Sequence, residues 1–594
     1  MSTTTPMTMA RLTTDAAGRY GDRPALRSKH DGEWTDTSFT QVAGNVEQLA
    51  LGLIALGIQP GDRVCILADT QPDWSMASLA IWSAAAVLVT IYPSSSAEEC
   101  EWVAGNSEAT AVICGNAAQV AKIQQIRGSL PELAHVIVMQ PAATAAPAIG
   151  LAELRNLGRN GDRAELRRRT EAVQPQDACM FIYTSGTTGR PKGCVLTHGG
   201  FAAVAAATRA LNLAQDDDVV YLFLPLAHVF AQIVAIATFE LGATTVYYGG
   251  DVKQIIAELA EVKPTYLPSV PRIFEKMYAA ATAMRAAASA EEQAQFDRAV
   301  ELGVEVRQLR QRGEPVSADQ QAAFETADER LFTLVRQLFG GRVRYAICGA
   351  APISPEVLKF FYACGVPVLE GYGMTETTGV ATVNLPDAIR FGTVGRAIPG
   401  AAVRIAGDGE IEIGGDVTFR EYWHNPEAME EIFTADGWVR TGDLGELDAD
   451  GFLKITGRKK DIIITAGGKN LTPANLENDL KQCRFISQAI MYGDRRPYPV
   501  VLITLDEEEI GPWAAQQGLP ADMPALAVHE QVRGMIQAEL DRANARYAQV
   551  EQIKRFVILD RDLSVETGEL TPSLKVKRMV VHKQHAGLFD ALYA

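Results

Sequence analysis

The sequence predicts an α/β fold: a large N-terminal domain of layered α/β sheets plus a small distorted β-barrel, followed by a small α+β C-terminal domain. A chain of 594 residues is too long for one ordinary hydrophobic core. Strand-like apolar runs alternate with helical segments over most of the chain, as in sheets of buried parallel strands. After about residue 400, short β segments are separated by Gly and Asp turns, which favours a small barrel or sheet.

The strand-like runs set the expected order of the elements. A helical spacing at 39–56 precedes them, and they follow at 64–67, 111–114, 136–139, 178–182, 219–223, 244–248 and 344–348. Residues 273–338 are rich in Ala, Glu, Gln and Arg, which predicts a helical insertion. The β-rich subdomain, at about 395–457, ends in a basic segment. We therefore expect an N-terminal domain of residues 1–459 and a C-terminal domain of residues 460–594.

One nearly uncharged segment, 74–97, is long enough to span a bilayer. It begins rich in Ala and Ser and then becomes β-branched at 87–92, which favours a helix followed by a buried strand. We therefore expect no transmembrane span. A peripheral contact with a membrane surface stays open, as does a homodimer.

The composition narrows the function. The net charge of −17 argues against a nucleic-acid surface, because phosphate backbones are bound by clustered Lys and Arg. An anionic substrate must therefore be captured by local positive groups. The eight cysteines form no Cys-x-x-Cys pair and lie mostly in apolar runs, which predicts buried thiols in a cytoplasmic protein. No signal peptide is visible in the Thr-rich start of the chain.

The segment 183–193 combines three glycines, four Ser or Thr hydroxyls and Lys192. Glycines let the backbone approach a ligand, and the hydroxyls and lysine supply donors and charge, so the loop suits a polyphosphate. It is not the Gly-x-x-x-x-Gly-Lys-Ser/Thr loop of other nucleotide-binding proteins. On composition alone, an ordinary surface connection remains an alternative.

The order of residues in this loop resembles the phosphate-binding loop of the adenylate-forming superfamily, which contains acyl-CoA synthetases, adenylation domains and luciferases. Six further segments agree in the same order: Leu224–His228, Gly349–Pro352, Glu370–Glu376, Thr441–Asp443, Gly457–Asp461 and Gly568–Arg578. Within the superfamily the chain is most similar to actinobacterial long-chain fatty-acid–CoA ligases, in segments that include Ser269–Lys276 and in the helical stretch after it. The resemblance covers nearly the whole chain.

The resemblance implies an ATP- and Mg²⁺-dependent ligase that forms an acyl-adenylate. Lys575, His228, Glu376 and Thr187 would be the catalytic residues, with Thr187 and Glu376 as ligands of Mg²⁺. Nucleotide or coenzyme A would contact these residues: Thr184, Ser185, Gly186, Thr187, Thr188, Gly189, Lys192, Gly349, Ala350, Ala351, Glu370, Gly371, Tyr372, Gly373, Met374, Thr375, Asp443, Arg458, Gly467 and Gly468. Taken singly, Lys575 could be a solvated lysine, His228 a buried structural histidine, Asp443 a turn residue and Tyr372 a core residue.

The resemblance also implies a second step, in which the thiol of coenzyme A attacks the acyl-adenylate and AMP leaves. The C-terminal domain would be mobile and would turn at Lys460, so that the loop at Gly467 and Gly468 meets the pantetheine arm. An acyl-AMP ligase that serves a carrier protein, or a ligase for aryl or medium-chain acids, is the alternative. We expect the acyl tunnel near 229–230, 269–270 and 245–248. Glu421 replaces a usual Gly, and we expect its segment, 419–423, to lie away from the catalytic motifs.

Overall fold

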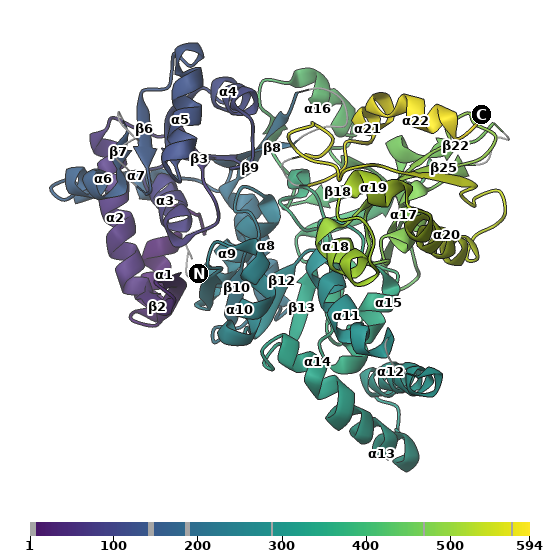
Figure 1. Cartoon of the computed structure of the whole chain (residues 1–594). Helices are drawn as coiled ribbons and strands as arrows, with labels where there is room; N and C mark the ends of the chain where they lie inside the picture. The colour runs from purple at the N-terminus through teal and green to yellow at the C-terminus, as the bar shows by residue number, and fades with distance from the viewer. Residues whose placement is uncertain (1–6, 141–147, 185–189, 287–288, 467–469, 572–573) are drawn as a thin grey trace.

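The computed structural model describes residues 7–140, 148–184, 190–286, 289–466, 470–571 and 574–594. Its framework is two large sheets, drawn in purple to green in Figure 1. The nine-stranded sheet has the order β16-β15-β14-β13-β12-β10-β11-β1-β2. Its strands are β1 (Pro24–His30), β2 (Glu33–Ser38), β10 (Val219–Leu222), β11 (Thr244–Tyr247), β12 (Tyr266–Ser269), β13 (Tyr345–Cys348), β14 (Val368–Tyr372), β15 (Thr382–Val383) and β16 (Arg396–Ala397).

The second sheet has eight strands in the order β19-β9-β8-β4-β3-β5-β6-β7. They are β3 (Arg63–Leu67), β4 (Val87–Ile91), β5 (Ala109–Cys114), β6 (His135–Val138), β7 (Ile149–Gly150), β8 (Ala178–Thr184), β9 (Lys192–Thr197) and β19 (Glu421–Tyr422). From β4 through β3 to β7 neighbouring strands run parallel, whereas β9 is antiparallel to β8 and β19 to β9. The predicted strands of both sheets are confirmed within a residue or two at each end.

Helices cover these sheets. They are α1 (Leu12–Tyr20), α2 (Phe39–Ala55), α3 (Pro72–Ser83), α4 (Ala97–Asn106), α5 (Ala117–Ile126), α6 (Leu151–Gly158), α7 (Arg163–Ala172), α8 (His198–Ala210), α9 (Val229–Leu241), α10 (Ile255–Val262), α15 (Pro355–Cys364) and α16 (Pro426–Ile432). The segment 74–97 is the helix α3 followed by β4, as predicted, and both are buried inside the protein. Among the described residues, no helix combines the length and the apolar character needed to cross a membrane.

The predicted helical insertion is confirmed as α11 (Pro271–Ala286), α12 (Ala290–Gln311), α13 (Ala318–Ala327) and α14 (Thr333–Leu338). Ser289 and Ser317 start α12 and α13 with capping boxes, which satisfy the free amides of each first turn. In Figure 1 α12 and α13 lie at the lower end of the molecule, far from the C-terminal helices. Phe332, Phe360 and Phe361 fill the core beneath them.

The β-rich stretch forms a four-stranded antiparallel sheet of β17 (Ala401–Ile405), β18 (Glu410–Gly415), β20 (Val439–Leu447) and β21 (Leu453–Arg458). Beyond it lie β22 (Ile463–Ile464) with β23 (Asn470–Leu471), and a three-stranded sheet of β24 (Ile486–Tyr492), β25 (Val500–Leu505) and β26 (Arg555–Ile558). Their helices are α17 (Pro473–Leu480), α18 (Glu507–Gln516), α19 (Met523–Val528), α20 (Glu530–Asn544), α21 (Arg578–Gln584) and α22 (Ala586–Ala591). Two buried apolar clusters draw their members from residues after 460 only.

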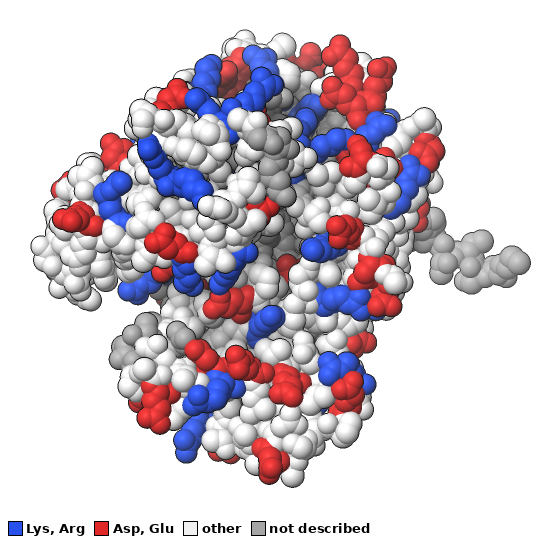
Figure 2. Space-filling model, turned by 90° about the vertical axis from the view of Figure 1, so that its right-hand side faces the viewer, with Lys and Arg blue, Asp and Glu red and all other residues white. Residues whose placement is uncertain are grey.

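All eight cysteines are free and buried, as the sequence predicts. Figure 2 shows one face of the protein, on which basic and acidic side chains are intermixed. Among its described residues, this face therefore offers no uniformly basic patch for an anionic ligand.

Candidate active site

A cavity of about 2490 Å³ lies between the sheets and the residues after 460, and both parts line it. The described members of the predicted site that line it are Thr184, Lys192, His228, Gly349, Ala350, Ala351, Glu370, Gly371, Tyr372, Gly373, Met374, Thr375, Glu376, Asp443, Arg458, Lys460 and Lys575. Ser185, Gly186, Thr187, Thr188, Gly189, Gly467 and Gly468 lie outside the described residues. The cavity therefore brings together residues almost four hundred positions apart in the chain.

The two ends of the glycine-rich loop are held by a β ladder. Thr184 of β8 pairs with Lys192 of β9, so the loop leaves and re-enters the sheet at one point. Trp102 supports the returning side, because its indole N–H donates to the carbonyl of Pro191 at 2.8 Å. Its ring also lies 4.7 Å from the guanidinium carbon of Arg190, a cation–π contact.

Glu376 is a buried carboxylate at the centre of the cavity wall. The Tyr422 hydroxyl donates to its Oε1 at 2.6 Å, and the Lys192 ammonium lies 5.2 Å from the centre of the Tyr422 ring. Burial and the charge of Glu376 raise the pKa of Tyr422, so the phenol stays protonated and donates. The expectation that segment 419–423 lies away from the catalytic motifs is therefore wrong. β19 carries Tyr422 to Glu376 by pairing with β9.

Of the two residues expected to bind Mg²⁺, Glu376 is the one that the structure describes. Among the described residues, no group of three or more His, Cys, Asp and Glu side chains is placed to hold a metal ion. Mg²⁺ in phosphate-transfer sites is usually held by one or two carboxylates together with phosphate oxygens and water. Glu376 in a nucleotide-sized cavity fits that pattern, and its predicted partner Thr187 lies outside the described residues.

A second polar cluster forms around Asp443 on β20. The Tyr372 hydroxyl donates to Asp443 Oδ2 at 2.7 Å, and Arg458 Nε lies 3.4 Å from Asp443 Oδ1. Arg458 is the register partner of Asp443 on β21, so the ladder itself places the cation. Burial raises the pKa of the Asp443 carboxyl, and Arg458 and Tyr372 oppose that shift. The alternative of a simple turn aspartate does not fit these contacts.

Residues 349–351 form the neighbouring part of the cavity wall. Gly349, Ala350 and Ala351 follow β13, and Ala350 has a φ of 69°, a conformation that L-residues rarely adopt. The segment from β14 to Glu376 forms the facing wall. Within it, burial raises the pKa of Glu370 to about 8. Both segments line the cavity, at the place that the resemblance gives to adenine.

His228 is the N-cap of α9, and its Nδ1 accepts a hydrogen bond from the Phe230 amide at 3.2 Å. Burial, followed by the positive charge of Lys575, lowers the pKa of His228 to about 3. The imidazole is therefore neutral at pH 7. Since the partial positive charge of a helix N-terminus lies at the same point, α9 presents a dipole rather than a full charge to the cavity.

Lys575 reaches the cavity from the last part of the chain. Its backbone closes a tight turn, in which Thr571 N donates to Lys575 O at 2.8 Å and Lys575 N donates to Thr571 Oγ1 at 3.0 Å. The pKa of its ammonium is lowered by desolvation and by Arg458, while Asp443 and Glu376 oppose the shift. The residue is exposed and lines the cavity, so the space that its side chain faces is the cavity.

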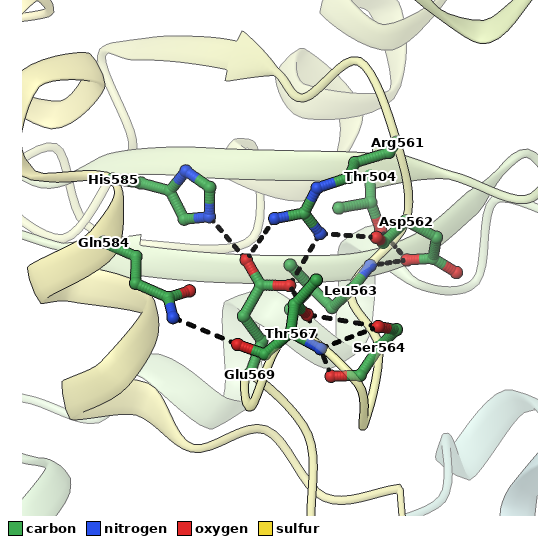
Figure 3. A network of polar contacts seen from close by, with 9 residues as sticks. All are labelled: Thr504, Arg561, Asp562, Leu563, Ser564, Thr567, Glu569, Gln584 and His585. Atoms are coloured by element: carbon green, nitrogen blue, oxygen red, sulfur yellow. Dashed lines mark hydrogen bonds and ion pairs between the residues drawn. The ribbon is translucent and has the colours of Figure 1, made fainter.

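The turn rests on a buried carboxylate that was not among the predicted site residues. Figure 3 shows Glu569 between Arg561 and His585, and its side chain has no solvent exposure. Arg561 donates to both carboxylate oxygens, at 2.6 and 2.8 Å, and His585 Nε2 lies 2.7 Å from Oε1. The Glu569 carbonyl also accepts from Lys577 N at 2.8 Å. The network therefore fixes the base of the hairpin that carries Lys575.

One part of the cavity lining is mostly apolar and comes largely from α8, α9 and the residues that follow α8; we call it the apolar branch. It is lined by Ala207, Thr208, Leu211, Leu213, Ala214, Ile233, Val234, Ala237, Thr238, Tyr266, Val383 and Ile398. Of the expected tunnel segments, only 229–230 lies in the cavity wall. The expectation of 269–270 and 245–248 is wrong, because these residues belong to β11, β12 and their flanks and are largely buried inside the nine-stranded sheet.

Solved structures share this two-part architecture. The adenylation domain of a carboxylate reductase from Mycobacterium chelonae superimposes with a TM-score of 0.80, at 21% identity, over 100% of this chain and 92% of that one. A fatty acyl CoA synthetase from Mycobacterium tuberculosis has a TM-score of 0.62, at 23% identity, over 98% of this chain and 99% of that one. The fold is therefore that of the adenylate-forming enzymes.

Sequence comparisons identify the family to which the chain belongs. Residues 13–423 match the model of the AMP-binding enzyme family, and residues 460–594 match that of the AMP-binding enzyme C-terminal domain. The long-chain-fatty-acid–CoA ligase FadD15 of Mycobacterium bovis is 39% identical over 95% of this chain and 93% of its own length. The long-chain-fatty-acid–CoA ligase ACSBG2 of Xenopus laevis is 33% identical over 99% of this chain and 84% of its own length. The chain belongs to the AMP-binding enzyme family.

Glu569→Gln is expected to destabilise the Lys575 hairpin, because it leaves the Arg561 guanidinium without its carboxylate. Arg561 holds the pKa of Glu569 down, against the effect of burial, to about 2 from the ordinary 4.5. The carboxylate therefore stabilises the folded hairpin above about pH 4.5, and this contribution disappears as the pH falls through 2. Hydrogen exchange of residues 555–577 should show a local loss of about 1–3 kcal/mol at pH 7.

The exposed Asp560, next to Arg561 in the chain, provides the control, and Asp560→Asn should change exchange little. An equal loss in both variants, or a Glu569→Gln effect that does not shrink below pH 4.5, would contradict the assignment.

Proposed function

We propose that this protein activates long-chain fatty acids with ATP, forming an acyl-adenylate, and then transfers the acyl group to coenzyme A with release of AMP and pyrophosphate. The observation that carries the proposal is the position of Lys575. Its ammonium stands in one cavity within electrostatic reach of Glu376, Asp443 and His228, across from the ends of the glycine-rich loop. The identity to fatty-acid–CoA ligases over nearly the whole chain supports it.

The proposed adenylation step accounts for the presence of Lys575 and Lys192 in one cavity. A carboxylate has to approach the α-phosphorus of ATP, and both partners are negatively charged. Lys575 and Lys192 would offset that repulsion and stabilise the charge that spreads over the phosphoryl oxygens in the transition state. Mg²⁺, held by Glu376 and by Thr187, would supply further positive charge when bound.

The other residues would position the substrates. Asp443 would accept hydrogen bonds from the ribose hydroxyls, with Arg458 and the Tyr372 hydroxyl holding its carboxylate in place. The backbone at 349–351 and the facing wall at 370–375 would hold adenine. His228 would meet the acyl carboxylate as a neutral donor at the N-terminus of α9, so it orients the anion without competing with Lys575 for it.

The second half-reaction requires a different arrangement of residues 460–594. We propose that they turn at Lys460 and bring Gly467 and Gly468 to the pantetheine arm. The residue before the hinge is fixed to the β-rich subdomain, because Lys459 Nζ pairs with Asp408 at 2.6 Å and with Glu410 at 3.0 Å. This fixed point supports a rotation that starts at the next residue. The proposal places the enzyme in the cytoplasm; contact with a membrane surface and dimer formation stay predictions.

The apolar branch along α8 and α9 supports a fatty acid rather than a compact aryl acid. A series of acids from about eight to about twenty carbons, with CoA present, should show kcat/KM rising with length by about 0.8 kcal/mol for each buried methylene. Ala237→Leu should remove this gain for the longer acids and leave the shorter ones unaffected, because Ala237 lines the branch. A preference for aryl acids, or an acyl-adenylate that CoA does not consume, would favour the alternatives.

Lys575→Ala should separate the two half-reactions. Acyl-adenylate formation, followed as acid-dependent exchange of pyrophosphate into ATP, is expected to fall by a factor of about 100 or more, because a charge aimed at the transition state is lost. Thioester formation from supplied acyl-adenylate and CoA should change little. Lys577→Ala, two residues further on, provides the control. Unchanged exchange in Lys575→Ala would remove Lys575 from the mechanism.

A further inference from the structure

The contact between α11 and the start of α18 joins the two parts of the chain through ion pairs. Arg272 and Lys276 lie one turn apart on α11, within the segment 269–276 that the proposed mechanism does not use. The Arg272 guanidinium bonds the carboxylate of Asp506, and Lys276 Nζ lies 3.0 Å from Glu508 Oε2. Lys253 adds a longer contact to Glu508, at 3.9 Å.

Asp506 caps α18 and also forms the ion pair with Arg272. It is the N-cap of α18, and its Oδ1 accepts from the amides of Glu508 and Glu509 at 3.1 and 3.3 Å. Its other oxygen, Oδ2, takes the Arg272 bond, and the side chain is only 8% exposed. The cap fixes the carboxylate before the ion pair forms, so the pair has to order only the Arg272 side chain, which is 41% exposed.

The three ion pairs at this contact have the same polarity. The first turn of α18 is acidic, with Glu507, Glu508 and Glu509, and the cations come from the N-terminal part of the chain. A rotation of residues 460–594 would carry this acidic turn away from α11 and break every one of these pairs together. They are made in the arrangement in which Lys575 stands in the cavity.

We propose that Arg272 and Lys276 form a clamp on Asp506 and Glu508 that selects the adenylation arrangement and has to open before thioester formation. This inference rests on the proposed function for its kinetic meaning. The four residues are positioning residues: they lie outside the cavity lining and act by placing Lys575. Weakening the clamp should therefore slow the first half-reaction and spare the second.

A charge swap tests the clamp. Lys276→Glu and Glu508→Lys, each alone, should lower acid-dependent pyrophosphate exchange by roughly threefold to tenfold, since each puts like charges at the contact. Neither should lower the rate of thioester formation from supplied acyl-adenylate and CoA. The double variant restores an ion pair of reversed sense and should restore exchange. Glu507→Lys, in the same helical turn but in none of the ion pairs described above, controls for loss of a helix-end charge.

A second measurement does not depend on activity. All native cysteines are buried, so spin labels can be placed on Leu334→Cys of α14 and Val528→Cys of α19, which are 61% and 73% exposed. The distance distribution between the labels should be narrow in the otherwise unchanged chain, broader in each single reversal, and narrow again in the swap.

The results of these experiments distinguish failure of the clamp from failure of the proposed function. Equal losses in both half-reactions, failure of the swap to restore exchange, or label distances that the reversals leave unchanged would overturn the clamp. Absence of pyrophosphate exchange with every acid in the unsubstituted protein would instead refute the proposed function, and the label distances would still decide the clamp.

Discussion

The buried carboxylate of Glu569 fixes the base of the hairpin that carries Lys575, and the proposed chemistry depends on the ammonium that this hairpin brings into the cavity. Glu569 lies between Arg561 and His585, which both contact its carboxylate. The amide of Lys577 donates to the Glu569 carbonyl and so closes the hairpin. Lys575 lies on the returning arm of this hairpin, opposite Thr571. In a protein of net charge −17, the meeting of two anionic substrates requires such a local cation, because the overall field repels both.

The two halves of the cavity are built differently. The N-terminal half is held by regular structure: β8 and β9 fix the ends of the glycine-rich loop, β20 and β21 pair Asp443 with Arg458, and His228 caps the start of α9. The C-terminal half, which carries Lys575, has its own three-stranded sheet and its own apolar clusters. Ion pairs between α11 and the start of α18 join it to the first half, and they have to break when it rotates. This contrast suits an enzyme that needs two arrangements of one site.

Much of the fold could be predicted from the sequence, because buried parallel strands such as β3 and β5 are continuous apolar runs with recognisable ends. The ordered motifs also predicted polar residues of the cavity discussed above, among them Lys192, Asp443 and Lys575. Tyr422 was missed because its contact with Glu376 arises from strand pairing between distant segments, which has no local signal. The tunnel was partly misplaced for the same reason: whether β11 or α8 faces the cavity is decided by packing between layers, which has no local signal in the sequence.

The central claim is that the fatty-acid carboxylate attacks the α-phosphorus of ATP in the cavity that Lys575 enters. It is tested most directly by the fate of the carboxylate oxygen. With fatty acid labelled with ¹⁸O in both carboxylate oxygens, one labelled oxygen bridges acyl and phosphoryl groups in the acyl-adenylate and stays on phosphorus when the thiol of coenzyme A takes the acyl group. Mass spectrometry should therefore find one ¹⁸O in AMP and none in pyrophosphate. Unlabelled AMP, or label in inorganic phosphate beside ADP, would contradict the account.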